Sequence, residues 1–418
     1  MRSLVVAVLL LIASTCSLQA ENWPNWRGPQ STGVAAGGPY PTRWSGTENV
    51  VWKVKLPGKG ASTPVVWNDQ IFVTCGVEGK NTLLCLNRAG QVQWTSTFGE
   101  EKPGKHVKAT GANPSAVTDG QHVFAYFKSG DLVAVDLQGR AVWQHNLQKQ
   151  FGEDTLWWDL GTSPVLTKNH VIVAVMHSGP SFLVAYEKDS GKLAWKQDRN
   201  LDAPSEAAQS YSTPVVYERD GQELLVVLGA DHVTGHDAAT GRELWRVGGL
   251  NPTGNSYFRS ISSAVVADGI VVAPYARGAS VTGIRLGGSG DVTKSHLPWA
   301  LTGLGADVPT PAVKDGRVYL CTDKGHLYVL DLQTGKTVAE LQLERNRNAY
   351  SSSPVLAAGH LYLTREDGRT FVVAVGDNNL QVVASNELSG EMTVATPVLV
   401  DGRLYLRTVD QLFCIGAK

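Results

Sequence analysis

Residues 236–245 read His-Asp-Ala-Ala-Thr-Gly-Arg-Glu-Leu-Trp. The Asp and the Thr-Gly pair are typical of a tight turn between two strands, because Asp tolerates positive φ and Gly favours it. Related turns end at Gly139, Gly191 and Gly335, and the apolar run that follows such a turn commonly carries Trp. The pattern therefore predicts one repeated hairpin element with a large aromatic residue on its last strand.

A second motif recurs with a regular spacing. It is a small or hydroxyl residue, then usually Pro, then small or apolar residues, as in Thr63-Pro64-Val65 and Ser353-Pro354-Val355. The second residue of the motif lies at positions 64, 114, 164, 214, 264, 311, 354 and 397, in steps of 50, 50, 50, 50, 47, 43 and 43. The second copy is placed at Asn113-Pro114-Ser115. Such spacing indicates eight copies of one structural unit.

Each unit predicts four short antiparallel strands joined by tight turns, which is the size of a propeller blade. The fold class is therefore all-β, an eight-bladed β-propeller over residues 47–418. The eighth unit stops after Cys414-Ile415 and lacks its fourth strand, whereas residues 49–55 resemble a fourth strand that carries Trp52. We expect residues 49–55 to pair with the last blade and close the ring, which leaves no free sheet edge at the junction.

The first 46 residues read as two segments. Residues 1–20 hold Arg2, an apolar run over residues 4–13 and small residues before Glu21, which is the pattern of a secretory signal peptide. Lipidation at Cys16 is a less favoured variant, because residues 13–15 depart from a lipoprotein signal. Residues 21–46 hold Trp23, Trp26, Trp44 and four prolines. This extension is predicted to pack on one face of the ring and cover part of the channel, with a role in recognition as the alternative.

Composition excludes several classes of protein. The chain has 37 Lys and Arg against 38 Asp and Glu, whereas nucleic-acid binders usually carry a basic excess. After the signal, no apolar run is long enough for a transmembrane helix, so we expect an exported protein, periplasmic or secreted, and a monomer. Cys75, Cys85, Cys321 and Cys414 fall at strand positions in different blades and are predicted to be free and buried.

The turn at residues 237–241, with Trp245 four residues after the Gly, resembles the PQQ-like β-propeller repeat, and residues 22–29 resemble the start of exported bacterial proteins with this repeat. That superfamily contains quinoprotein alcohol dehydrogenases, which hold PQQ and Ca²⁺ over the channel mouth. It also contains a non-enzymatic branch with the lipoprotein propeller of the outer-membrane β-barrel assembly machine. The repeat is specific for fold and weak for function.

The sequence departs from the dehydrogenase pattern. No two cysteines are adjacent, the loops between strands are mostly short, and no Cys-x-x-Cys-His haem attachment motif is present. We therefore expect no cofactor, with PQQ and calcium as the alternative, and no metal site. The resemblance implies that the repeat Trp residues are structural and dock each blade on the next: Trp52, Trp94, Trp143, Trp195, Trp245 and Trp299.

Residues just before each Pro motif should approach one mouth of the channel. They combine aromatic rings with acids, bases and amides, which suits a binding site for a small molecule, sugar or peptide. The alternative is that the charged residues only form ion pairs that tie the loops together. The candidates are Lys59, Trp157, Trp158, Asp159, Gln209, Tyr211, Arg259, Asp307, Tyr350 and Glu391.

Three functions follow from these observations. The favoured one is a binding or scaffolding propeller outside the cytoplasm, whose partner is a protein, a small molecule or a saccharide. The second is a PQQ-dependent alcohol dehydrogenase, supported by the repeat alone. The third is an enzyme of another class, for example one acting on polysaccharides through paired carboxylates among Asp159, Asp307 and Glu391. The sequence names no catalytic residue.

Overall fold

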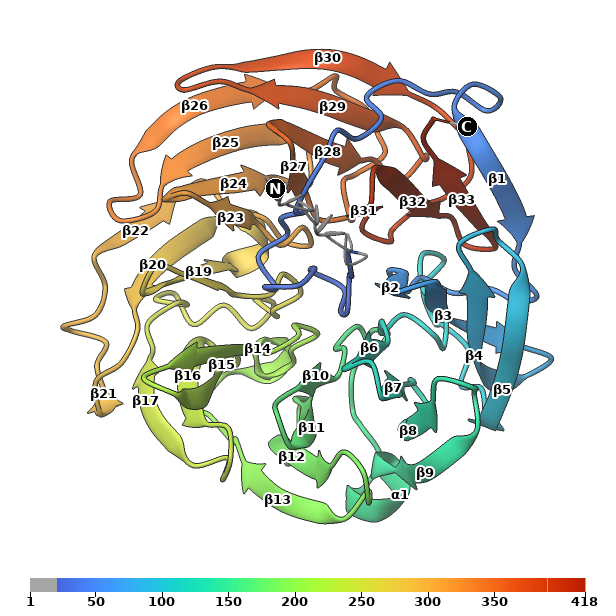
Figure 1. The fold of residues 1–418 in the computed structure, drawn as a ribbon. Coiled ribbons are helices and arrows are strands. Elements are labelled where there is room, and N and C mark those ends of the chain that lie inside the picture. The colour runs from blue at the N-terminus through green and yellow to red at the C-terminus, as the bar shows by residue number, and fades with distance from the viewer. Residues whose placement is uncertain (1–20, 389, 418) are drawn as a thin grey trace, which may run out of the picture.

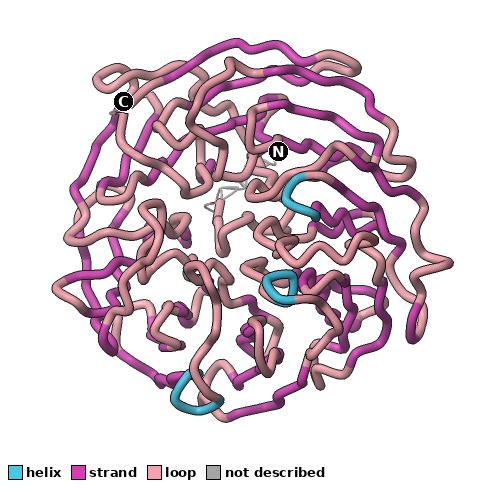
Figure 2. Tube along the Cα trace, turned by 180° about the vertical axis from the view of Figure 1, so that it is seen from behind, coloured by secondary structure: helices cyan, strands magenta, loops and turns pink. Residues whose placement is uncertain are grey.

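The computed structural model describes residues 21–388 and 390–417, so the predicted signal peptide and Cys16 lie outside the described residues. Eight antiparallel sheets stand radially around a central channel, as Figure 1 shows, and the predicted eight-bladed propeller is confirmed. The helices of the described chain are short, the cyan segments of Figure 2: α1 (Leu147–Phe151) and η1 (Ser205–Ala208) lie between blades, and η2 (Ala276–Gly278) lies within the fifth blade.

The first four blades follow the chain order, from the innermost strand outward. They are β2 (Val65–Trp67), β3 (Gln70–Val77), β4 (Lys80–Asn87) and β5 (Val92–Glu100); β6 (Val117–Thr118), β7 (His122–Tyr126), β8 (Asp131–Asp136) and β9 (Ala141–Asn146); β10 (Val165–Leu166), β11 (His170–Val175), β12 (Phe182–Glu187) and β13 (Leu193–Asp198); and β14 (Val215–Arg219), β15 (Gln222–Gly229), β16 (His232–Asp237) and β17 (Glu243–Val247).

The last four blades repeat this plan with two variations. They are β18 (Val265–Ala267), β19 (Ile270–Tyr275), β20 (Ser280–Arg285) and β22 (Trp299–Thr302); β23 (Ala312–Lys314), β24 (Arg317–Cys321), β25 (His326–Asp331) and β26 (Thr337–Gln342); β27 (Val355–Ala357), β28 (His360–Thr364), β29 (Thr370–Val375) and β30 (Leu380–Asn386); and β31 (Val398–Val400), β32 (Arg403–Arg407) and β33 (Gln411–Ile415) with β1 (Val50–Lys55).

The ring closes as the sequence predicts. Strand β1 is the outer strand of the eighth blade and pairs antiparallel with β33, with Trp52 opposite Cys414. The second variation is β21 (Gly290–Asp291), which leaves the fifth blade and pairs in parallel with β17 of the fourth. The four cysteines of the described chain are free and buried, as expected.

Most repeat Trp residues lie between their own blade and the next. The indole Nε1 of Trp143 donates to the carbonyl of Lys188 at 2.7 Å, and a Cβ added to Gly191 would lie 2.6 Å from the Trp143 Cγ. Trp52, Trp94 and Trp299 make equivalent contacts with Arg88 and Gly90, Leu137 and Gly139, and Leu332 and Gly335. Glycine with positive φ is thus required where the indole covers the turn.

Trp195 and Trp245 depart from this arrangement in different ways. Trp195 covers Gly241 of the next blade, but its buried Nε1 has no hydrogen-bond partner among the described residues. Trp245 instead covers Gly235 of its own blade, because the fifth blade replaces the tight turn with the excursion that forms β21. The indole of Trp245 is buried there in the core between the fourth and fifth blades.

The extension at residues 21–46 crosses one end of the channel, as the dark blue segment of Figure 1 shows. Trp23 exchanges two backbone hydrogen bonds with Val66 of β2, and Ala35 donates to the carbonyl of Leu356 in β27. Trp23 and Trp44 are buried in the core shared by the first, seventh and eighth blades. The extension therefore packs on the ring and is bound to the innermost strands of the first and seventh blades, which flank the eighth.

Candidate functional site

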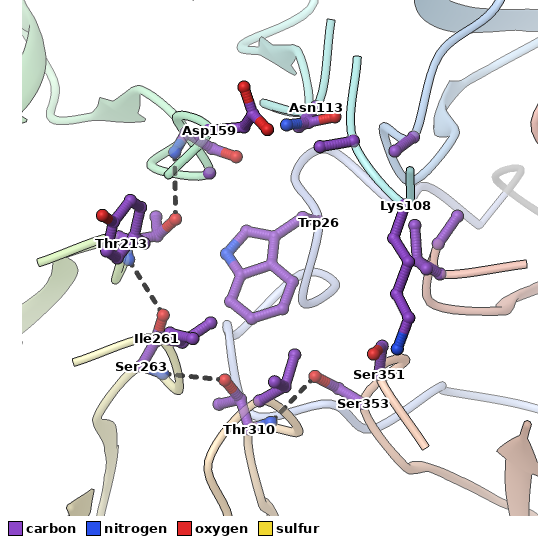
Figure 3. Close-up of a pocket in the computed structure, with 18 of the residues that line it drawn as sticks. Trp26, Lys108, Asn113, Asp159, Thr213, Ile261, Ser263, Thr310, Ser351 and Ser353 are labelled. Carbon is purple, nitrogen blue, oxygen red and sulfur yellow. Dashed lines mark hydrogen bonds between the residues drawn. The ribbon is translucent and has the colours of Figure 1, made fainter. Parts of the chain in front are cut away.

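A ring of hydroxyl groups lines the channel beneath the loops that enter the innermost strands. In each blade one backbone N–H donates to the side-chain oxygen of the equivalent residue in the next blade, at 2.9–3.3 Å. Figure 3 shows part of this ring with the bonds dashed. Its members are Thr63, Ser115, Ser163, Thr213, Ser263, Thr310, Ser353 and Thr396.

This ring corrects the register of the second blade. The repeat was placed on Asn113, but the hydroxyl that completes the ring belongs to Ser115. Asn113 instead accepts from the backbone N–H of Thr110 and donates to the carbonyl of Leu160. Pro114 is therefore not equivalent to the other repeat prolines, and the true steps on either side are 52 and 48 residues.

Trp26 forms the floor of a pocket above this ring. Its indole lies in the middle of the ring and is seen face-on along the channel in Figure 3. The Arg27 guanidinium carbon lies 5.5 Å from the centroid of the Trp26 ring, and the guanidinium donates to the carbonyls of Pro311 at 2.6 Å and Pro354 at 2.9 Å. The cavity above Trp26 has a volume of about 500 Å³, and all eight hydroxyl residues of the ring line it.

Asp159 anchors one wall of the pocket. Its carboxylate accepts the backbone N–H groups of Lys105 and His106 at 2.9–3.0 Å and pairs with the buried Lys128 ammonium. Burial alone would raise the pKa of Asp159, but Lys128 and these N–H donors lower it below its ordinary value. Asp159 therefore stays ionised and fixes the loop at residues 103–109.

Arg259 lines the pocket from the loop that enters the fifth blade, two blades away from the loop of Asp159, and has few partners. Its side chain is 10% exposed, its Nε lies 3.4 Å from Glu206 and its Nη2 lies 3.6 Å from Asp307. Burial raises the pKa of Asp307, which Arg259 only partly offsets. The carboxylate of Asp323 accepts the N–H groups of Asp307 and Val308 and so fixes this loop.

The predicted Trp157 and Trp158, together with Tyr257, lie exposed on the loops that carry the pocket residues Trp158 and Arg259, and this exposed edge is called the rim. Trp157, Trp158 and Tyr257 are 48%, 45% and 58% exposed. Their loops are joined, since the backbone N–H of Trp157 donates to the buried amide of Gln209, and the N–H of Ala207 donates to the carbonyl of Ser256. The Trp158 indole donates to Glu206 at 2.8 Å.

The structure separates the predicted residues into two groups. Trp158, Asp159, Tyr211 and Arg259 line the pocket. Six others lie outside its lining and are held elsewhere or exposed: Lys59 and Trp157 are exposed, Gln209 is buried against Tyr211 and Ser178, Asp307 lies behind Arg259, Tyr350 is buried beside Gly325, and Glu391 accepts from Thr408 and Gln411.

Sequence reasoning placed Trp26 in the extension expected to cover part of the channel but did not single it out as a site residue, and it missed the hydroxyl ring and Arg277. The hydroxyls could have been found, because a hydroxyl residue stands in nearly every Pro motif. Arg277 lines the pocket from η2, where it has φ 54° and is flanked by Ala276 at φ 57° and Gly278 at φ 79°. Lys108 also lines the pocket, but its ammonium is paired with Glu366 at 2.7 Å.

Within residues 21–388 and 390–417, no three His, Cys, Asp or Glu side chains come together as candidate metal ligands. None of the helices in that part of the chain has the length and apolarity needed to cross a bilayer.

Comparison with known proteins places this architecture. The fold is similar to that of BamB from Moraxella catarrhalis, with a TM-score of 0.63 and 14% identity over 88% of this chain and 97% of that chain. It is also similar to a europium-containing methanol dehydrogenase (TM-score 0.71, 11% identity, 96% of this chain and 99% of that chain) and to quinohemoprotein alcohol dehydrogenase from Comamonas testosteroni (TM-score 0.68, 12% identity, 94% and 80%).

Identities this low show a shared fold and nothing finer. No curated protein matches the sequence significantly. The family model of outer membrane protein assembly factor BamB matches residues 42–182 and 158–377, which together span most of the propeller. The chain therefore belongs to the BamB family of PQQ-like repeat propellers.

Proposed function

We propose that this protein is an exported binding module that docks a partner polypeptide on the face of the ring where the pocket opens. The observation that carries the proposal is the cluster of exposed Trp157, Trp158 and Tyr257 at the pocket rim. Exposed Trp and Tyr gathered on one face are typical of binding hot spots, since each buries a large area at a low entropy cost.

The pocket itself supports binding more than catalysis. Asp159, Glu391 and Asp307 do not converge, since Asp159 is paired with Lys128, Glu391 accepts from Thr408 and Gln411, and Asp307 lies behind Arg259. These carboxylates therefore provide no opposed acid and base for hydrolysis of a glycosidic bond. The loops that carry the rim aromatic residues are held to each other by hydrogen bonds, so they present a partner with a surface of fixed shape.

The double variant Trp157→Ser, Tyr257→Ser tests this role. Both side chains lie outside the pocket lining, so the change removes rim area without altering the pocket. The variant and the wild type are used to capture exported proteins of the producing organism, and bound proteins are quantified by mass spectrometry. We expect at least one protein captured by the wild type to be lost about tenfold or more, which corresponds to about 1.4 kcal/mol.

The matched control is Val142→Ser, Val382→Ser, which removes two exposed apolar side chains from the outer strands β9 and β30. It should capture the same proteins as the wild type. If the rim variant captures the same proteins in the same amounts, docking at this face is refuted.

Export makes a separate prediction about the first described residue. The backbone nitrogen of Glu21 lies 3.0 Å from Oδ1 of Asp401, whose other oxygen pairs with Arg88. Cleavage after residue 20 would turn this nitrogen into an ammonium and strengthen the contact. We expect the intact mass of the exported protein to correspond to a chain that starts at Glu21. A lipid-modified chain that starts at Cys16, or an uncleaved chain, would contradict this prediction.

A PQQ-dependent dehydrogenase remains the alternative function, and the residues do not fit its cofactor. A calcium-bound quinone needs a set of oxygen ligands for the metal. Among the residues that the structure describes, the acidic side chains near the pocket lie against Lys128, Lys108 or Arg259 or accept from backbone N–H groups, and no three of them come together as metal ligands.

A further inference from the structure

Arg259 is a buried pocket residue whose hydrogen-bonding capacity is largely unused. A guanidinium carries five N–H donors. In the described structure the buried Nε and Nη1 atoms of Arg259 have no hydrogen-bond acceptor, although the side chain is nine-tenths buried. A buried donor without an acceptor costs about 1–3 kcal/mol, more when it is charged. The free protein thus holds Arg259 in a position that only an additional acceptor would satisfy.

The two carboxylates near Arg259 do not supply that acceptor. The closest contact to Glu206 is 3.4 Å and that to Asp307 is 3.6 Å, both longer than a charge-assisted hydrogen bond of about 2.7–2.9 Å. Glu206 is also engaged by the Trp158 indole at 2.8 Å. These acids balance the charge of Arg259 without filling its donors.

Arg277 adds a second cation to the same pocket. It stands in a left-handed backbone conformation that a non-glycine residue adopts at a cost of about 1–2 kcal/mol. Its side chain is exposed, lines the pocket and makes no ion pair with any described residue. Backbone strain of this kind persists where the fold holds it, and here it presents a cation toward the cavity.

From these contacts we infer that the pocket takes a carboxylate side chain of an acidic peptide segment, bound by the planar guanidinium of Arg259 and balanced by Arg277. The two oxygens of a carboxylate can accept two parallel N–H groups of a guanidinium, whereas a neutral carbonyl offers only one oxygen and no charge. The rest of such a segment would lie across Trp158 and the exposed rim. This inference rests on the proposed docking function and names the chemistry of the partner.

Two blocked tripeptides test the inference. The probe is glutamate-phenylalanine-glutamate with acetyl and amide ends, and its twin carries glutamine in place of each glutamate. We expect isothermal titration calorimetry to show the acidic peptide binding the wild type at least about tenfold more tightly than the twin, as a charged hydrogen-bonded pair warrants. Arg259→Gln should abolish this preference. Arg259→Lys should retain a part of it, because lysine keeps the positive charge but lacks the two parallel N–H donors of the guanidinium.

The matched control is Arg345→Gln, which removes an exposed arginine that does not line the pocket. It should keep the full preference, and melting curves check that each variant is folded. Equal affinity for the two peptides, a preference that survives Arg259→Gln, or no binding of the acidic peptide at millimolar concentration would overturn the inference. Glutarate binding as tightly as the acidic peptide would show that a free acid is recognised, which overturns the peptide assignment.

The outcome is separable from that of the docking proposal. Loss of a captured protein in the Trp157→Ser, Tyr257→Ser variant without any acid preference in the peptide assay leaves docking intact and refutes the carboxylate. The reverse result refutes rim docking while Arg259 still selects acidic peptides.

Discussion

Replacing Trp143 with alanine is expected to lower the free energy of unfolding by about 3 kcal/mol, as for other truncations of large aromatic side chains. The indole lies between the second and third blades, packs near Phe124 and Tyr186, and donates to the carbonyl of Lys188. Because the side chain is half-buried, we place the loss at the low end of the range for core aromatics. Urea unfolding followed by circular dichroism measures it.

Trp157→Ala is the matched control for this substitution. It removes the same number of atoms from a side chain at the exposed rim, so the expected loss is below about 1 kcal/mol. A converse variant, Gly191→Ala, should also destabilise the protein, since its Cβ would meet the Trp143 ring at 2.6 Å and the residue has φ 67°. An unchanged urea midpoint for Trp143→Ala would refute docking of the blades through this indole.

The architecture was predictable because it repeats. Because the pattern occurs eight times, an error in placing one copy does not change the predicted fold. The last blade lacks its fourth strand in the sequence, which pointed to residues 49–55 as the replacement, and the pairing of β1 with β33 confirms this. The error at Asn113 arose because two residues flank Pro114, Asn113 without a hydroxyl group and Ser115 with one, and either could have been the repeat position. Only the hydrogen bond from Thr63 to Ser115 distinguishes them.

The site was only partly predictable, because its parts come from distant segments. Trp26 occupies the channel owing to contacts of Arg27 with Pro311 and Pro354, about 300 residues away, which no local pattern encodes. Tyr350 was one residue from the expected register, and that difference turns its ring under Gly325 and away from the pocket. The predicted mouth residues that line the pocket lie where the blade spacing stays at 50 residues, but Gln209 lies there too and is buried against Tyr211 and Ser178, so the spacing alone does not decide which side chains reach the pocket.

Removal of the Asp159 carboxylate is expected to destabilise the protein by about 3–5 kcal/mol, as for other buried ion pairs that lose one partner. Asp159→Ala leaves the Lys128 ammonium buried without a counter-charge, and it frees the N–H groups of Lys105 and His106. The double variant Lys128→Met, Asp159→Leu removes both charges together. It should recover part of the loss, and failure to recover any would mean that the backbone N–H contacts dominate.

The pH dependence distinguishes the charge of Asp159 from its shape. The folded pKa lies below the unfolded value, so the ionised carboxylate stabilises the native state at pH values above about 3.9, and this contribution disappears as the pH falls through the folded pKa. The stability difference between wild type and Asp159→Asn should therefore be constant from neutral pH to about pH 5 and shrink only under more acidic conditions. Urea midpoints measured across this range test it. A difference that already declines between pH 7 and pH 5 would contradict an ionised Asp159 held by Lys128, because a carboxylate with a lowered pKa takes up no proton there.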